Sequence, residues 1–299
     1  EGTSFGRPAC NEIISLMESS QGVLWAGTWY GGLARFNKET GQFRYYFGEG
    51  DTLTIPRIRT LFQRTANSFY LGSDDGLYTF NTTTGKCLPT DDGQSKESIY
   101  ACYQDREGGI WIGTYFSGVS YLSPKHKDIE WYYPTGTENS LSGNVISQFC
   151  EAPDGNIWIA TEDGGLNLFD PRTKKFKNHL LRSSNPTIGY HNIHALLHNE
   201  GKLWIGSFSR GLYILDTQTG KMKNYRHNRA NPHSIPNDHI YSIYQTKDGS
   251  IFLGTLSGFC RYDPESDSFR TLEPLSHIFI YDMVEDQHGD LWLASKRDG

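Results

Sequence analysis

The sequence of 299 residues lacks any long hydrophobic run and any cluster of basic charge. No stretch approaches the roughly 18 uncharged apolar residues that a membrane-spanning helix needs, so we expect this segment to make no direct membrane contact. Lys and Arg number 28 against 34 Asp and Glu, and no Lys/Arg run exceeds two residues. The basic surface typical of nucleic-acid binding is absent, and we expect no nucleic-acid partner.

The sequence also lacks the motifs of metal sites and of catalysis. Its five cysteines form no C-x-x-C pair, which argues against a zinc site and leaves their disulfide state open. His191, His194 and His198 resemble a zinc-binding spacing, but that spacing works on a helix, and this segment aligns with strands. No phosphate-binding loop and no G-x-S-x-G motif occurs, and the carboxylates are scattered. We therefore expect no catalytic residues, no metal and no cofactor, and we predict that the chain is not an enzyme.

The composition is rich in glycine and aromatic residues. The chain contains 32 Gly, 16 Phe, 18 Tyr and 7 Trp. Glycine and aromatic residues at this level are typical of short strands joined by tight turns, and the aromatic content is ample for a packed core.

One motif recurs: glycine, any residue, an aliphatic residue, Trp, an aliphatic residue, Gly or Ala, then Thr or Ser, with weaker copies centred on Tyr70 and Phe252. A good example is Gly155-Asn-Ile-Trp158-Ile-Ala-Thr161. The anchor aromatics of the seven copies are Trp25, Tyr70, Trp111, Trp158, Trp204, Phe252 and Trp292. Their spacings of 45, 41, 47, 46, 48 and 40 residues indicate a repeat of one structural unit.

Each copy contains the pattern of four short strands. An alternating run such as Ile13–Met17 comes first, then the anchor strand, then a third strand such as Gly165–Phe169, then a more variable fourth strand. Four strands joined by Gly turns form one antiparallel sheet, which buries both faces only when several sheets pack radially. We predict an all-β fold: a single domain over residues 1–299, a seven-bladed β-propeller of four-stranded blades. A solenoid is the alternative, but it favours shorter repeats.

The last blade is expected to be incomplete. The sequence stops at Gly299, in the turn after the seventh anchor strand, and Gly2–Phe5 only loosely resembles a third strand. We interpret the chain as a fragment of a longer protein, or as a protein with a partly completed seventh blade.

The repeat resembles the two-component regulator propeller repeat, through Leu24-Trp-Ala-Gly-Thr28 with Gly32-Leu-Ala-Arg-Phe36, and through 157–170. The resemblance implies the periplasmic sensor region of a Bacteroides-type hybrid two-component histidine kinase. It implies that the region recognises oligosaccharides from polysaccharide breakdown and signals to the kinase, with other domains of the same chain, and a homodimer, as partners. Two alternatives stay open. One is a protein-docking scaffold without a small-molecule site, and the other is a lyase of streptogramin-lyase type, which would use His191 and His239 near the axis.

Two sets of loops share one face of a propeller: those between the second and third strands, and those before each first strand. In these loops the residues differ from copy to copy, and exposed aromatics mix with charged and amide groups, a mixture that suits a sugar. The face also suits the docking of another domain or a dimer partner. The predicted ligand-binding residues are Trp29, Tyr30, Arg57, Tyr115, Phe116, Asn144, Glu162, His191, Phe208, Arg210, His239 and Arg297.

Overall fold

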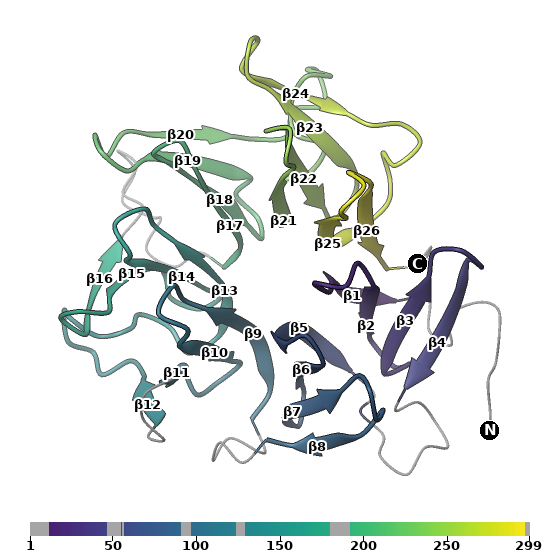
Figure 1. Cartoon of the computed structure of the whole chain (residues 1–299). Helices are drawn as coiled ribbons and strands as arrows, with labels where there is room; N and C mark the ends of the chain where they lie inside the picture. The colour runs from purple at the N-terminus through teal and green to yellow at the C-terminus, as the bar shows by residue number, and fades with distance from the viewer. Residues whose placement is uncertain are drawn as a thin grey trace.

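The computed structural model of the chain describes residues 12–46, 55, 57–90, 97–123, 129–179 and 192–296. Every regular element in these ranges is a β-strand, and the strands form antiparallel sheets set around a common centre (Figure 1). Within the described ranges, no helix has the length and apolar character needed to cross a bilayer.

Six sheets contain four strands each, in sequence order from the axis outwards. The first three are β1 (Ile13–Glu18), β2 (Leu24–Thr28), β3 (Leu33–Asn37) and β4 (Gln42–Tyr46); β5 (Ile58–Thr65), β6 (Ser68–Ser73), β7 (Gly76–Asn81) and β8 (Cys87–Pro89); and β9 (Ile99–Gln104), β10 (Ile110–Thr114), β11 (Val119–Leu122) and β12 (Ile129–Tyr132). The next three are β13 (Ile146–Glu151), β14 (Ile157–Thr161), β15 (Gly165–Asp170) and β16 (Lys175–His179); β17 (Ile193–Asn199), β18 (Lys202–Ser207), β19 (Leu212–Asp216) and β20 (Met222–Tyr225); and β21 (Ile240–Gln245), β22 (Ile251–Thr255), β23 (Phe259–Asp263) and β24 (Ser268–Thr271).

The prediction of seven four-stranded blades is wrong. The structure has six such blades, and the seventh repeat contributes only a two-stranded sheet, β25 (Ile280–Glu285) with β26 (Leu291–Ser295). The motif counts anchor strands, and the described residues end at Lys296, directly after the seventh anchor strand. Within the described part of the chain, no third or fourth strand pairs with β26.

The anchor aromatics pack between neighbouring sheets. The Trp25 ring lies 5.1 Å from the ring of Phe69 in the next blade, and the Trp111 ring lies 5.0 Å from that of Phe169. Both tryptophans are almost fully buried, in clusters that span two blades. Each anchor strand therefore joins its own blade to the following one, which is why the aromatic residue recurs.

The small residue of the motif marks a close approach between blades. A Cβ on Gly113 would lie 2.6 Å from Cγ2 of Ile146, the first residue of the next inner strand, and Gly206 meets Ile240 in the same way. Ala294 of the seventh repeat is fully buried in a cluster with Ile13 of the first blade. The same position therefore allows every neighbouring pair of sheets to approach.

The final Thr or Ser of the motif closes the turn between the second and third strands. The Thr114 hydroxyl donates to the Gly118 carbonyl at 2.9 Å and accepts from the Ser117 amide at 2.9 Å. Thr28, Thr161 and Ser207 make the same pair of bonds in their own blades. These hydroxyls hold the loops of one propeller face in a shared conformation, while the side chains of those loops vary.

The two-stranded sheet lies between the sixth and first blades and joins them (Figure 1). The Asp282 carboxylate of β25 accepts the Leu16 amide of β1 at 3.1 Å. Lys38 of the first blade donates to Asp286 at 2.6 Å, and the Trp292 ring lies 5.1 Å from that of Phe36. The ring therefore closes through its inner strands.

Candidate ligand-binding site

Each of the seven inner strands contains a bulge at its second residue. The register of pairing with the anchor strand skips this residue in every sheet. A bulged residue is left out of the ladder of strand pairs, and the bulge re-aims its side chain. The seven bulged residues are Ile14, Arg59, Tyr100, Ser147, His194, Tyr241 and Tyr281.

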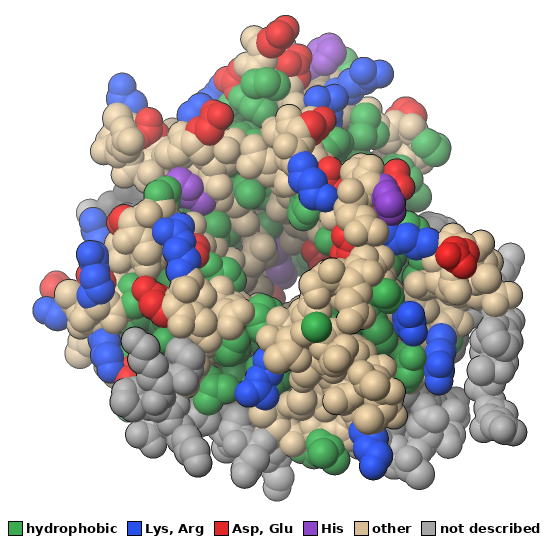
Figure 2. Space-filling view, in the orientation of Figure 1, with side chains coloured by type: hydrophobic (Ala, Val, Ile, Leu, Met, Phe, Trp, Pro, Cys, Tyr) green, Lys and Arg blue, Asp and Glu red, His purple; other side chains and the backbone are tan. Residues whose placement is uncertain are grey.

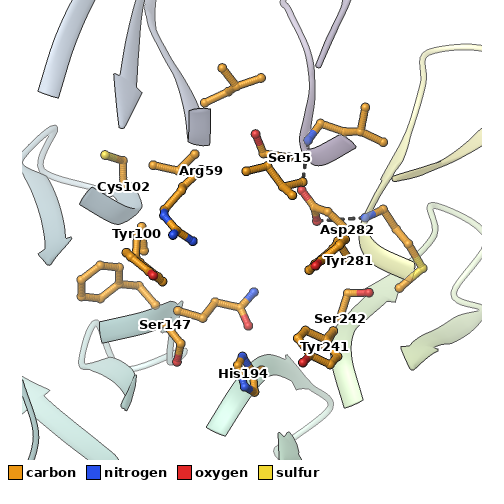
Figure 3. Close-up of a pocket in the computed structure, with 18 of the residues that line it drawn as sticks. Ser15, Arg59, Tyr100, Cys102, Ser147, His194, Tyr241, Ser242, Tyr281 and Asp282 are labelled. Carbon is orange, nitrogen blue, oxygen red and sulfur yellow. Dashed lines mark hydrogen bonds between the residues drawn. The ribbon is translucent and has the colours of Figure 1, made fainter. Parts of the chain in front are cut away.

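All seven bulged residues line one cavity at the centre of the ring. The cavity has a volume of about 390 Å³ and is lined by residues from all seven inner strands. The close-up shows Arg59, Tyr100, His194, Tyr241 and Tyr281 around this space (Figure 3). The space-filling view shows the molecule hollowed at its centre (Figure 2). Since every sheet supplies a side chain, the cavity is a property of the assembled ring.

The two predicted sets of loops do share one face. The Tyr115 amide donates to the Ser98 carbonyl at 2.9 Å, and the Phe208 amide donates to the Asn192 carbonyl at 2.8 Å. The first, fourth and sixth blades contain the equivalent backbone bond. Each loop between a second and third strand therefore lies beside the segment before the inner strand of its own blade. We call this surface the loop face.

On one side of the loop face, two arginines lie against aromatic rings. The Arg57 guanidinium carbon lies 3.9 Å from the centre of the Trp29 ring, and that of Arg59 lies 4.0 Å from the centre of the Tyr100 ring. Arg57 donates to the Asp74 carboxylate at 2.5 Å, and Arg59 Nε donates to the other oxygen of that carboxylate. Stacking and ion pairing fix both guanidinium groups at the entrance to the cavity.

The aromatic surface extends from this arginine pair towards the solvent. The Tyr100 and Tyr115 rings stack 4.7 Å apart, and the Phe116 ring lies 4.3 Å from that of Tyr115. The Phe116 side chain is 70% exposed and that of Tyr30 is 64% exposed. The row therefore runs from the axial cavity to open solvent.

On the opposite side, aromatic rings surround a buried histidine. The His194 ring lies 4.7 Å from that of Tyr241 and 5.6 Å from that of Phe208, which in turn contacts His239 at 4.7 Å. Tyr241 also contacts Tyr281, at 5.7 Å. This half of the site offers ring faces and hydroxyl groups, with few charges.

Burial sets the charge of two groups in the site. It lowers the pKa of His194 to about 4, so this imidazole is neutral at physiological pH. Its Nδ1 lies 3.7 Å from a Glu162 oxygen, and its Nε2 is buried with no hydrogen-bond partner among the described residues. Burial also raises the pKa of Glu162, and the positive charge of Arg59 partly offsets that rise. The site therefore contains a buried ring nitrogen that no group in the described ranges satisfies.

The structure brings most of the predicted residues to the two sides of the cavity mouth. Those near the mouth are Trp29, Tyr30, Arg57, Tyr115, Phe116, Glu162, Phe208 and His239. The backbone amide of Asn144 donates to the Asp163 carboxylate, and the Arg210 side chain is exposed. Within the described ranges, no hydrogen bond, ion pair or ring contact joins either residue to a bulged residue. His191 and Arg297 lie outside the described residues.

The loops alone did not indicate the bulged residues. Arg59, Tyr100, Tyr241 and Tyr281 form the wall of the cavity, and none of them was predicted as a site residue. A signal exists in the sequence: the second residue of the inner strand changes in nearly every copy, while the residue before it is always Ile when the copies are aligned on the structure. A variable column next to a constant one indicates a surface that the fold leaves free.

A metal centre has no support from this geometry. Across the described ranges, no three His, Cys, Asp or Glu side chains converge as metal ligands would. Four of the five cysteines lie in the described part, and no disulfide joins any two of these four. Burial raises the pKa of the Cys150 thiol to about 11, so this thiol stays protonated at neutral pH.

The fold and the repeat together define the class of protein: this is a β-propeller, four of whose repeats match the two-component regulator propeller. The family model of the two-component regulator propeller matches residues 8–30, 93–116, 140–163 and 234–257, which confirms the resemblance seen in the sequence. Each of these segments ends in the loop that follows an anchor strand. Such a propeller is a non-catalytic domain, which confirms the expectation that this chain is not an enzyme.

Particular relatives belong to longer proteins. The chain is 28% identical over 82 residues to histidine kinase P4 of Formosa agariphila, a match that covers 24% of this chain and 6% of that protein. It superposes on the extracellular domain of a hybrid two-component system from B. thetaiotaomicron with a TM-score of 0.81 and 17% identity, over 97% of this chain and 38% of that one. The chain thus spans a minor part of the length of both relatives.

A streptogramin B lyase has a similar fold. It superposes with a TM-score of 0.71 and 13% identity, over 98% of this chain and 93% of the lyase. At this identity the likeness extends to the propeller fold alone.

Proposed function

We propose that this propeller is the extracytoplasmic ligand-sensing part of a hybrid two-component regulator, and that it binds an oligosaccharide at the loop face. One observation carries the proposal: an axial cavity whose mouth combines fixed guanidinium groups, tyrosine hydroxyls and exposed aromatic rings. Aromatic faces pack on the C–H faces of sugars, and guanidinium and hydroxyl groups bind sugar oxygens.

The relatives support a proposal for the setting of the domain. The solved relative from B. thetaiotaomicron is an extracellular domain of a two-component system, and the matched F. agariphila protein is a histidine kinase. We place this chain in the periplasm, as one propeller domain within a longer chain that signals to a histidine kinase. Its partners are then the other domains of that chain, and a second copy in a dimer.

A rigid propeller limits how binding produces a signal. Each four-stranded blade is packed on both sides, and neighbouring inner strands are bonded to one another, as in the bond from Ser15 to the Ile58 carbonyl at 3.2 Å. A ligand shifts an equilibrium only through its different affinity for two states. We expect those states to differ in how the propeller sits against its neighbours, while the blades themselves keep their packing.

Thermal unfolding with a panel of oligosaccharides tests the proposal. A ligand present at 100 times its Kd adds about 2.7 kcal/mol to the free energy of unfolding, which raises Tm by a few degrees in a domain of this size. We expect one glycan class to raise Tm, and Tyr100→Ala to abolish the rise. Leu88→Ala, which changes a 66% exposed residue of an outer strand, serves as the control and is expected to keep it.

A docking scaffold is the second candidate. The exposed rings of Tyr30 and Phe116 favour it, since an apolar surface on a loop face also suits a neighbouring domain. The same panel separates the two functions: a scaffold gives no shift in Tm with any glycan, and loses affinity for its neighbouring domain on Phe116→Ser.

A further inference from the structure

We propose that the arginine side of the axial cavity selects an oligosaccharide that bears an anionic group, a uronic carboxylate or a sulfate ester, and that Arg59 is the residue that binds this group. The inference rests on the proposed function, because it names the ligand class of the same site.

Arg59 is fixed in place and yet keeps free donors. Its Nε is taken by Asp74, and its guanidinium lies against Tyr100 at 4.0 Å and Trp29 at 5.3 Å. Among the residues that the structure describes, its two Nη groups have no hydrogen-bond acceptor. The side chain lies beside the cavity in the close-up view (Figure 3). A guanidinium held through Nε presents its remaining N–H groups as a planar fork, which matches the two oxygens of an anionic group.

The charges at this side are unbalanced. Arg57 and Arg59 share a single carboxylate, Asp74, so the three groups carry a net positive charge. Arg57 Nε is also buried without a partner in the described chain. A second positive charge beside the binding arginine favours an anion over a neutral hydroxyl group.

Two carboxylates near the cavity oppose this arrangement, those of Glu162 and Asp282, and both oxygens of Asp282 already accept backbone amides, from Leu16 and Met283. Glu162 is close enough to Arg59 for that positive charge to affect its pKa, and burial raises the pKa above the usual value. A group that is already costly to ionise takes up a proton more readily when a second negative charge arrives. Glu162 can then donate a hydrogen bond to the ligand, so its position does not exclude an anion.

The tyrosines complete a site for the rest of the sugar. Tyr100, Tyr241 and Tyr281 line the cavity, and burial raises the pKa of both Tyr100 and Tyr241 to about 12, so the two hydroxyls stay protonated as donors. His194 adds the buried Nε2. A cavity of about 390 Å³ suits one or two sugar rings, and the aromatic row beyond it suits a longer chain.

Calorimetric titration with four probes of similar length tests the inference. The probes are an oligogalacturonate (carboxylate only), a carrageenan oligosaccharide (sulfate only), a chondroitin sulfate oligosaccharide (both groups) and a neutral galactan oligosaccharide. We expect at least one anionic probe to bind tenfold more tightly than the neutral one, and its affinity to fall as salt is raised. Comparison of the oligogalacturonate with the carrageenan oligosaccharide shows whether the site binds a carboxylate or a sulfate group.

Variants then assign the effect to Arg59. We expect Arg59→Gln to weaken binding of the anionic probe tenfold or more, and Arg59→Lys, which keeps the charge and loses the fork, to have an intermediate effect. The control Arg172→Gln removes the same charge from an exposed turn between a third and a fourth strand, and is expected to change affinity less than twofold. Circular dichroism and Tm establish that each variant is folded.

Three results would overturn the inference. If the neutral probe binds as tightly as the anionic ones and Arg59→Gln has no effect, selection of an anion is wrong while the sugar site stands. If an anionic probe binds but Arg59→Gln and Arg172→Gln weaken it equally, Arg59 is not the binding residue. If no probe of either class binds, this inference and the proposed function both fail.

Discussion

At the scale of the residue, the Gly or Ala before the final Thr or Ser of the motif is required because a larger side chain has no room there, and not because of turn geometry. In the anchor strands, this position faces the first inner-strand residue of the next blade. A Cβ added to Gly113 would lie 2.6 Å from Cγ2 of Ile146, so a methyl group fits only if the neighbouring inner strand moves away.

Gly113→Ala should therefore destabilise the propeller by about 1–3 kcal/mol, through overpacking between two blades. Ala160→Gly, at the same motif position in the following blade, removes a methyl group that already fits, and is expected to cost about 1 kcal/mol. Urea unfolding of the two variants measures both costs. A Gly113→Ala variant as stable as the unchanged protein would contradict the steric explanation.

At the scale of the element, anchor strands differ in how well their outer edge is covered. All five residues of β10 are buried, and β11 pairs along its edge. In β26 the first three residues are only partly buried, and no strand pairs beyond it in the described ranges. The anchor tryptophans of these strands are otherwise matched, because an aspartate accepts the indole N–H in both: Asp105 at 2.9 Å and Asp286 at 3.0 Å.

Truncation of these two tryptophans should have unequal costs. Trp111→Ala removes a ring that is 1% exposed and contacts four other aromatic rings, and we expect a loss of about 3–5 kcal/mol. Trp292→Ala removes a less buried ring and should cost less than half of that. Thermal and urea unfolding provide the comparison, and equal losses would show that β26 is as well covered as β10.

The strands also show how far sequence reasoning reaches. Anchor aromatics and turn residues are dictated by packing within and between adjacent blades, so they recur and can be recognised. The bulge at Arg59 and Tyr100 is a departure from strict alternation that the assembled ring imposes, and a period of two does not reveal it. The cavity wall was missed for that reason, while the loop residues Trp29 and Tyr115 were named from the sequence.

At the scale of the whole molecule, the blade count was the main error. The motif marks second strands, so seven motifs predict seven anchor strands and no more. The incomplete seventh repeat was counted as a blade, and the described residues contain only its first two strands. Ring closure instead depends on β25 and on polar contacts to the first blade, notably those of Asp282 and Asp286.

This closure should make stability depend on pH. Burial raises the pKa of Asp282 to about 6, so the folded protein holds a proton that the unfolded chain has released between about pH 4 and pH 6. The free energy of unfolding contributed by this group is therefore highest below pH 4 and falls as the pH rises to 6. At about 1.4 kcal/mol for each pKa unit, we expect a loss of about 1–3 kcal/mol.

Asp282→Asn tests this assignment. The amide oxygen can still accept the Leu16 N–H and no charge has to be buried, but the bond from the Met283 N–H to the second carboxylate oxygen is lost. The variant should have a higher Tm than the unchanged protein at pH 7.5 and a slightly lower Tm at pH 4. A variant that is less stable at both values would show that the charge itself strengthens the closure.

The bulged residues of the inner strands have a consequence for how such sensors diversify. Because a bulged residue takes no part in the ladder of strand pairs, its side chain can change without cost to the pairing that holds a blade together. Seven such positions, one from each repeat, converge on a single cavity. Exchange of one repeat for another would then replace one of the seven bulged residues that line the cavity and leave the architecture intact. A fold assembled by duplication can in this way acquire new specificities by recombination, without a new fold for each ligand.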